Sequence, residues 1–174
     1  MRGDVTEEIA ERRARVAHQV LDSWHLIPGA KEDGTLDEKE LTDWVEAARK
    51  QCTETNHVIG CDLQIGFMLA HAPGDPDGTW PHAVVRNLIE RLNNETIDRH
   101  IQNEIYNSRG VVSKGLNDGG KQERALSEKY KKMSDDVKAK WPRTAAMLRG
   151  MAESYEHQAR REDIDSDLYD LRWD

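Results

Sequence analysis

Residues 28–41 contain carboxylates at a spacing that could bind calcium. The segment, PGAKEDGTLDEKEL, matches the second half of a calcium-binding helix–loop–helix when its Asp-Gly pair forms the central turn. Asp33 and Glu40 then occupy two ligand positions of the loop. Gly29 and Lys31 occupy the other two, and neither offers a carboxylate oxygen. The ligand set is incomplete, so we do not expect a calcium site.

The same letters predict the start of a helix. Asp33 and Gly34 are a typical turn pair. Thr35 and Glu38 fit a capping box, in which the Glu38 amide donates to the Thr35 hydroxyl while the Glu38 carboxylate reaches back to the helix start. On this interpretation the segment only separates two helices.

A second segment, Gly115–Gln122, has the GxxxxGK spacing of a phosphate-binding loop. Such a loop needs Ser or Thr after the lysine and a buried strand before it, but Gln122 follows the lysine and GVVSK is only a short apolar patch. We therefore do not expect an NTPase. Arg109, Lys114 and Lys121 nevertheless lie close to a predicted helix N-terminus, so they are the candidate anion-binding residues.

Arg13 and His18 have the R-x4-H spacing found in one class of helical ribonucleases. That class usually has a polar residue after the arginine, whereas this chain has Ala14. A chain with seven histidines and many arginines also contains such pairs by chance. A helical ribonuclease that uses Arg13 and His18, or a phosphate-binding enzyme that uses Lys121, is kept as the alternative function.

Metal and cofactor chemistry has little support in the sequence. Only Glu54 and His57 have the Glu-x-x-His spacing that a di-iron bundle needs twice. Cys52 and Cys61 lack CxxC spacing, which predicts reduced thiols in a cytoplasmic protein. We predict no metal, no cofactor and no complete catalytic set, and this leans against an enzyme.

The elements that position these residues follow from apolar residues at helical spacing. Asp62 is expected to cap the third helix, and Pro81 to lie in the first turn of the fourth. Because no segment alternates with period two, the predicted fold is all-α, with about seven amphipathic helices in a bundle or in stacked hairpins and no significant sheet. The helices are expected at about residues 5–24, 36–53, 58–69, 84–92, 97–105, 125–137 and 145–159, the last continuing toward the C-terminus.

The expected organisation is a single helical domain over residues 1–174. An alternative is two sub-bundles, 1–108 and 120–162, joined by a glycine-rich loop at 109–120. Residues 163–174 would form an acidic amphipathic tail.

Charge and hydropathy exclude some partners. A formal net charge of −8 disfavours nucleic acid. A helix-turn-helix that begins in DLQIGFMLAHAP ranks last, since the acidic loop APGDPDGTWP follows where a basic recognition helix should begin. The sequence has neither a run of about 18 apolar residues nor a signal-like start, so we expect a cytoplasmic protein that does not cross a membrane.

Four of the five tryptophans, Trp24, Trp44, Trp80 and Trp141, are predicted at helix ends, where the ring covers the edge of the core. The fifth belongs to the acidic tail EDIDSDLYDLRWD. Ile164, Leu168, Leu171 and Trp173 recur there at helical or near-helical spacing and are the candidate partner-binding residues. Such a strip either docks on its own domain or binds a basic groove on a partner.

Several longer phrases together resemble a known group of proteins. They are DSWHLIPGAKEDGTLDEKELTDWVEAAR, GTWPHAVVRNLIERL, YNSRGVVSKG, GGKQERALSEKY and WPRTAAMLRGMAESYEHQARREDIDSDL. Over about residues 18–171 the chain resembles the C-terminal helical region of large uncharacterised multidomain bacterial proteins. The resemblance implies attachment to a long N-terminal portion and a role in stress or anti-phage defence, and it supplies no catalytic residues.

Together these observations predict a non-catalytic helical interaction or scaffold module of a larger bacterial assembly. Its partner would be another protein or the parent chain, and homo-oligomers remain open.

Overall fold

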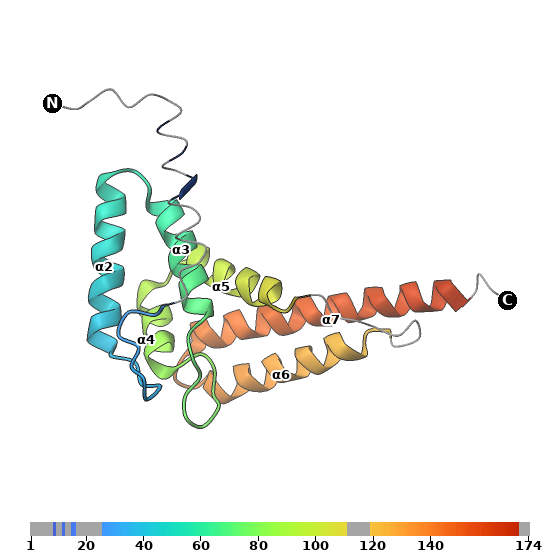
Figure 1. Ribbon diagram of the computed structural model, residues 1–174. Helices are drawn as coiled ribbons and strands as arrows, with labels where there is room; N and C mark the ends of the chain where they lie inside the picture. The colour runs from blue at the N-terminus through green and yellow to red at the C-terminus, as the bar shows by residue number, and fades with distance from the viewer. Residues whose placement is uncertain (1–8, 10–11, 13–14, 17–25, 111–118, 171–174) are drawn as a thin grey trace.

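The computed structural model describes residues 9, 12, 15–16, 26–110 and 119–170, and it confirms the all-α prediction (Figure 1). Within these ranges there is no sheet, only an isolated bridge between Ala30 and Leu36. The helices are α2 (Glu38–Glu54), α3 (Val58–Ala70), α4 (Ala83–Leu92), α5 (Glu95–Ser108), α6 (Lys121–Val137) and α7 (Pro142–Asp170).

Of the first predicted helix, residues 5–24, only Ile9, Arg12, Arg15 and Val16 are described, and these are helical. Trp24 and the Arg13–His18 pair lie outside the described residues. Within 26–110 and 119–170, none of the helices combines the length and the hydrophobicity that a transmembrane segment needs.

The start of α2 differs from the predicted capping box. The Thr35 hydroxyl donates to the Asp33 carboxylate at 2.6 Å, and the N-cap is Asp37, whose carboxylate accepts from the Glu40 amide at 3.0 Å. Leu36 is therefore not helical; it is buried in the bridge that closes the turn. The prediction failed because Asp33 accepts from both the amide and the hydroxyl of Thr35, while Asp37 takes the N-cap position two residues later.

Three other local predictions are also corrected. Asp62 does not cap α3; it lies inside that helix, and the N-cap is His57. Pro81 precedes α4, whose N-cap His82 accepts from the Val84 amide at 3.2 Å. Trp44 lies within α2 and is 39% exposed, so it does not mark a helix end.

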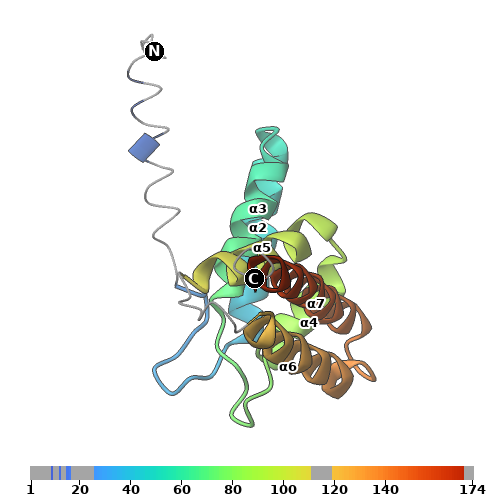
Figure 2. The same cartoon turned by 90° about the vertical axis from the view of Figure 1, so that its right-hand side faces the viewer.

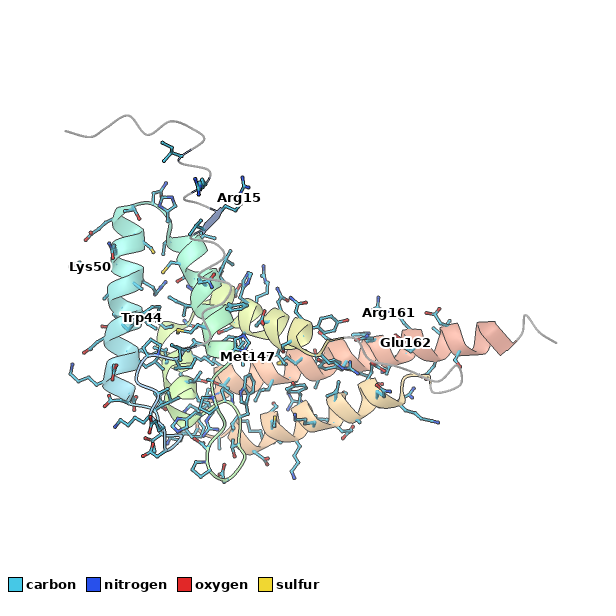
Figure 3. The ribbon with its side chains drawn as sticks, in the orientation of Figure 1. Arg15, Trp44, Lys50, Met147, Arg161 and Glu162 are labelled. Atoms are coloured by element: carbon cyan, nitrogen blue, oxygen red, sulfur yellow. The ribbon has the colours of Figure 1, made fainter. Side chains whose placement is uncertain are left out.

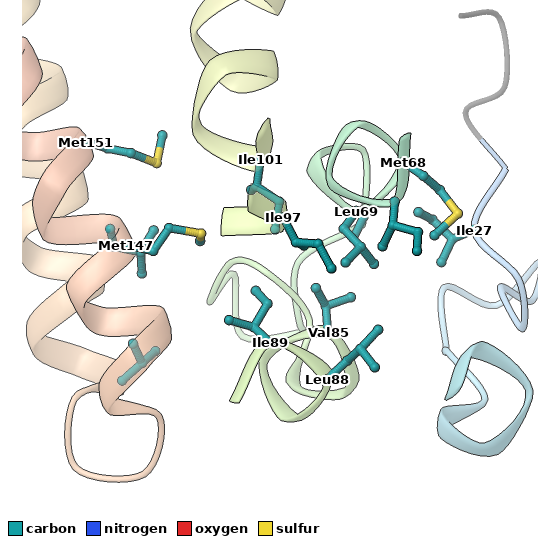
Figure 4. Close-up of a cluster of buried hydrophobic side chains, with 14 of the residues drawn as sticks. Ile27, Met68, Leu69, Val85, Leu88, Ile89, Ile97, Ile101, Met147 and Met151 are labelled. Atoms are coloured by element: carbon teal, nitrogen blue, oxygen red, sulfur yellow. The ribbon is translucent and has the colours of Figure 1, made fainter. Parts of the chain in front are cut away.

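The helices form two antiparallel pairs set at a steep angle to each other (Figures 1 and 2). One is the α2–α3 hairpin, with α5 packed along α3; the other is α6 with the much longer α7. Residues of α4 and α5 fill the space between the pairs (Figure 4). The hydrophobic cluster there contains Met68 and Leu69 from α3, Val85, Leu88 and Ile89 from α4, Ile97 and Ile101 from α5, and Met147 and Met151 from α7.

Small residues allow the closest helix contacts. A Cβ on Gly66 of α3 would lie 2.7 Å from both the His100 Cβ and the Ile97 carbonyl oxygen of α5. On α6, buried Ser127 and Ser134 donate their hydroxyls, each at 2.8 Å, to the α7 carbonyls of Ala152 and Ala145. Helices with many charged residues can therefore pack closely, because small residues line the contact and its buried hydroxyls are hydrogen-bonded.

Candidate functional site

The N-terminus of α6, where the sequence predicted an anion site, is bound by a carboxylate of the chain itself. The Gly120 amide donates to Asp163 Oδ1 at 2.9 Å, and the Arg124 guanidinium pairs with both oxygens of Asp163. The Gly120 bond first, and Arg124 second, hold the pKa of the Asp163 carboxyl below its ordinary value. An α7 side chain thus occupies the anion position that a helix start offers.

The predicted anion-binding residues do not form one site in the described part of the chain. Arg109 pairs with Glu123 at 3.1 Å, and its guanidinium lies 5.6 Å from the centre of the Tyr155 ring. Because the Glu123 side chain is buried, Arg109 is directed into the protein. Lys121 is the exposed first residue of α6, and Lys114 lies outside the described residues.

The predicted tail is, as far as Asp170, a continuation of α7. This helix has 29 residues and extends beyond the start of α6, which lies opposite Ala159 and Asp163 (Figure 1). Ile164 is 58% exposed on the extension, and Leu168 follows one turn later along the helix. Leu171 and Trp173 lie outside the described residues. We call residues 164–170 the distal segment of α7.

The surroundings of the distal segment are charged. Asp165, Asp167 and Asp170 belong to it, and Glu162 and Asp163 precede it. Figure 3 shows Arg161 and Glu162 on α7 just before this segment, far from Trp44 and Lys50 on α2. The extension therefore combines the exposed Ile164 side chain with a sequence in which acidic residues predominate.

Four partly buried arginine–carboxylate pairs join separate elements, and the sequence pattern predicted none of them. Asp62, 5% exposed, accepts from Arg49 of α2 at 2.7 Å and from Asn94, the N-cap of α5, also at 2.7 Å. The other pairs are Arg86–Asp75 at 2.5 Å, Arg109–Glu123 at 3.1 Å and Arg143–Asp98 at 2.7 Å. None of these pairs is separated by three or four residues, so no local helical pairing pattern could have predicted them.

The beginning of α7 is held by α4. Glu90 accepts from the Thr144 amide at 2.8 Å and from the Thr144 hydroxyl at 3.0 Å, so it caps α7 from another helix. Trp141 donates its indole N–H to Asn87 at 2.8 Å, and the Arg86 guanidinium lies 4.1 Å from the centre of its ring. Glu90, Asn87 and Arg86 of α4 therefore hold the start of α7 in place through contacts within the protein.

Two clefts have linings of different chemistry. One, of about 600 Å³, lies between the loop before α4, α5 and α6, and Trp80, Ile105, Tyr130 and Met133 line it. The other, of about 430 Å³, lies along α6 and α7 and has mixed charge, including Lys131, Arg149 and Glu153. Neither lining contains a cysteine, and across the described residues no three or more His, Cys, Asp and Glu side chains gather where a metal ion could bind.

Comparison with known proteins assigns no family. No protein-family model matches the chain, and neither the curated proteins nor the solved structures that were searched contain a match.

Proposed function

We propose that this chain is a non-catalytic helical protein–protein interaction module and that it binds its partner through the distal segment of α7. The observation that carries the proposal is the length of α7, which continues past the start of α6. Ile164 is exposed there, and Leu168 follows on the same helix at i+4. Leu171 continues this spacing in the sequence, and Trp173 follows two residues later.

Charge defines the class of partner. Acidic residues flank the apolar positions of the distal segment, so the complementary surface is an apolar groove or helix with basic edges. Such a surface could belong to another protein, to a parent chain or to a second copy of this chain. The resemblance noted above favours a larger bacterial assembly, and stress or anti-phage defence is the biological setting that we propose.

The arginine geometry supports a non-catalytic role over the alternative enzyme. Arg109, one of the proposed anion ligands, is paired with Glu123, and the start of α6 beside Lys121 is bound by Asp163. A phosphate would have to displace the Asp163 carboxylate to reach that helix start.

Site-specific photo-crosslinking in cells tests the proposal. A photoreactive phenylalanine analogue replaces Ile164 in one variant and Ile59 in the control, an isoleucine that is 70% exposed on α3. We expect a discrete crosslinked adduct from position 164 and much less from position 59, and mass spectrometry distinguishes a second copy from another protein. Equal adduct yields at the two positions would show that the distal segment is not the binding element.

A matched substitution gives an independent readout. Ile164→Glu should abolish the adduct formed by an analogue at position 168, because a buried charge at the apolar contact is unfavourable. Asp165→Asn, which changes an exposed neighbour, should leave that adduct within about twofold of the parent yield. Circular dichroism of both variants should be unchanged, since Asp163 and its bond to α6 are retained.

A further inference from the structure

The only two cysteines of the chain lie on the facing ends of the α2–α3 hairpin. Cys52 is in the last turn of α2, Cys61 is in the first turn of α3, and residues 55–57 connect the helices. The His57 amide donates to the Cys52 carbonyl at 2.7 Å, and the Cys61 amide donates to the His57 carbonyl at 3.1 Å. Backbone hydrogen bonds through one residue thus link the two cysteines.

An ion pair fixes the register of the hairpin. Arg49 and Cys52 are three residues apart on α2, so they share a face of that helix. Arg49 Nε donates to Asp62 Oδ1 at 2.7 Å, and Asp62 is the residue that follows Cys61. Asn94 also holds Asp62, at 2.7 Å, so the register does not depend on one contact. The same register places Cys52 and Cys61 on facing ends of the two helices, and Cys52 is among the groups that raise the pKa of the Cys61 thiol.

We propose that Cys52 and Cys61 are a redox modification site that hydrogen peroxide converts to an intramolecular disulfide. Both side chains are half-buried, so a small oxidant can reach them while their backbones stay hydrogen-bonded. The site is independent of the distal segment of α7, which lies on another element.

The chemistry balances with one molecule of peroxide. The Cys52 sulfur attacks one peroxide oxygen, the O–O bond breaks, and Cys52 sulfenic acid and water are formed. The Cys61 sulfur then attacks the Cys52 sulfur, the S–O bond breaks, and a second water leaves with the Cys61 proton. Two thiols and one H₂O₂ become one disulfide and two H₂O.

The order of attack follows from the environment of the two thiols. Burial first, and then the contact with Cys52, raises the pKa of the Cys61 thiol to about 12. Cys61 therefore stays protonated at neutral pH, and this leaves Cys52 as the first sulfur to react with peroxide.

Intact-mass spectrometry of the purified full chain is the decisive experiment. The chain is reduced, freed of reductant and treated with a few equivalents of hydrogen peroxide at neutral pH. We expect a mass loss of about 2 Da, loss of both N-ethylmaleimide labels, and full recovery of both labels after dithiothreitol. The disulfide should also raise the melting temperature by about 3 to 8 °C, because it closes a loop in the unfolded chain.

Two single variants serve as matched controls. Cys52→Ser and Cys61→Ser each retain one thiol and cannot form the bond, so they should gain oxygen or form dimers between chains. We expect disulfide formation in the natural chain to be at least about tenfold faster than dimer formation by either variant at micromolar concentration. The proposal is overturned if the natural chain keeps two alkylatable thiols, if its product gains oxygen irreversibly, or if its disulfides join only separate chains.

Discussion

Asp163 of α7 accepts a 2.9 Å hydrogen bond from the amide of Gly120, the residue at the N-cap of α6. This contact fixes where α6 begins along α7, and it leaves the residues after Asp163 as an extension beyond the pair. A Cβ on Gly120 would lie 2.3 Å from the Ala159 carbonyl oxygen, so only glycine allows this approach. The carboxylate thus serves the fold, whereas Ile164, the next residue of α7, is exposed.

Asp163→Asn should remove a pH-dependent part of the stability. Because the folded pKa of Asp163 lies below the ordinary value of 3.8, its contribution is complete above pH 3.8. The contribution is lost as the pH falls through the folded pKa, where the native carboxylate becomes protonated. Urea unfolding at several values between about pH 2 and 7 should show a difference between the natural chain and the variant that closes at the acid end.

Asp165→Asn is the control for that experiment. It makes the same change in net charge two residues further along α7, on a different face of the helix. No bond from Asp165 to α6 is seen among the described residues. The unfolding midpoint of the Asp165→Asn variant should therefore stay close to that of the natural chain. Equal destabilisation by the two variants would mean that the Gly120 contact contributes nothing specific.

Gly66→Ala and Gly60→Ala, both on α3, should change stability in opposite directions. A methyl group at position 66 would meet the α5 backbone at 2.7 Å, so we expect a loss of about 1 to 3 kcal/mol. Nothing lies within 4 Å of a methyl group at position 60, and alanine should stabilise the helix there by about 0.5 to 1 kcal/mol. Chemical denaturation measures both effects, and a neutral result at position 66 would contradict the close approach of α3 to α5.

Asp62→Ala should be the more costly of two aspartate substitutions. Asp62 is buried and holds Arg49 and Asn94, and its removal leaves both donors without their acceptor. We expect a loss of about 2 to 4 kcal/mol in the free energy of unfolding. Asp43→Ala removes an exposed i, i+4 pair with Lys39 and should cost less than about 0.5 kcal/mol. Similar losses at both positions would show that the Asp62 network is no stronger than a surface pair.

Tyr130 should ionise late in an alkaline titration. Burial first, and then the neighbouring Tyr155 ring stacked at 5.7 Å, raise the pKa of the Tyr130 phenol to about 12. In the unfolded chain the Tyr130 phenol ionises near pH 10. The contribution of the neutral phenol to stability is therefore complete below pH 10, and it is lost as the pH rises toward 12.

Absorbance at the phenolate band measures the ionisation of all four tyrosines. Tyr130→Phe should remove amplitude from the late component. If Tyr130→Phe removed only early amplitude, the Tyr130 phenol would not be buried in the folded protein.

Much of the fold could be predicted because amphipathic helices repeat their apolar residues locally. The spacing of Ile97, Ile101 and Ile105 predicted α5, and the structure buries the first two in the core. Helix starts were harder to predict, as the capping box at Thr35 shows, because two nearby aspartates offer alternative acceptors: Asp33 accepts from the Thr35 amide and Asp37 from the Glu40 amide. The role of Asp62 was missed because its partners are 13 and 32 residues away in the sequence.

By itself, the sequence of this protein determined the helical class and, within the described residues, the approximate extent of the helices, since both depend on residues a few positions apart. Only the tertiary structure decided that Asp163 occupies the start of α6, that Arg109 faces Glu123, and that the two cysteines lie on the facing ends of a helical hairpin. Those relationships depend on how helices approach one another, and small residues such as Gly66 and Gly120 set that approach.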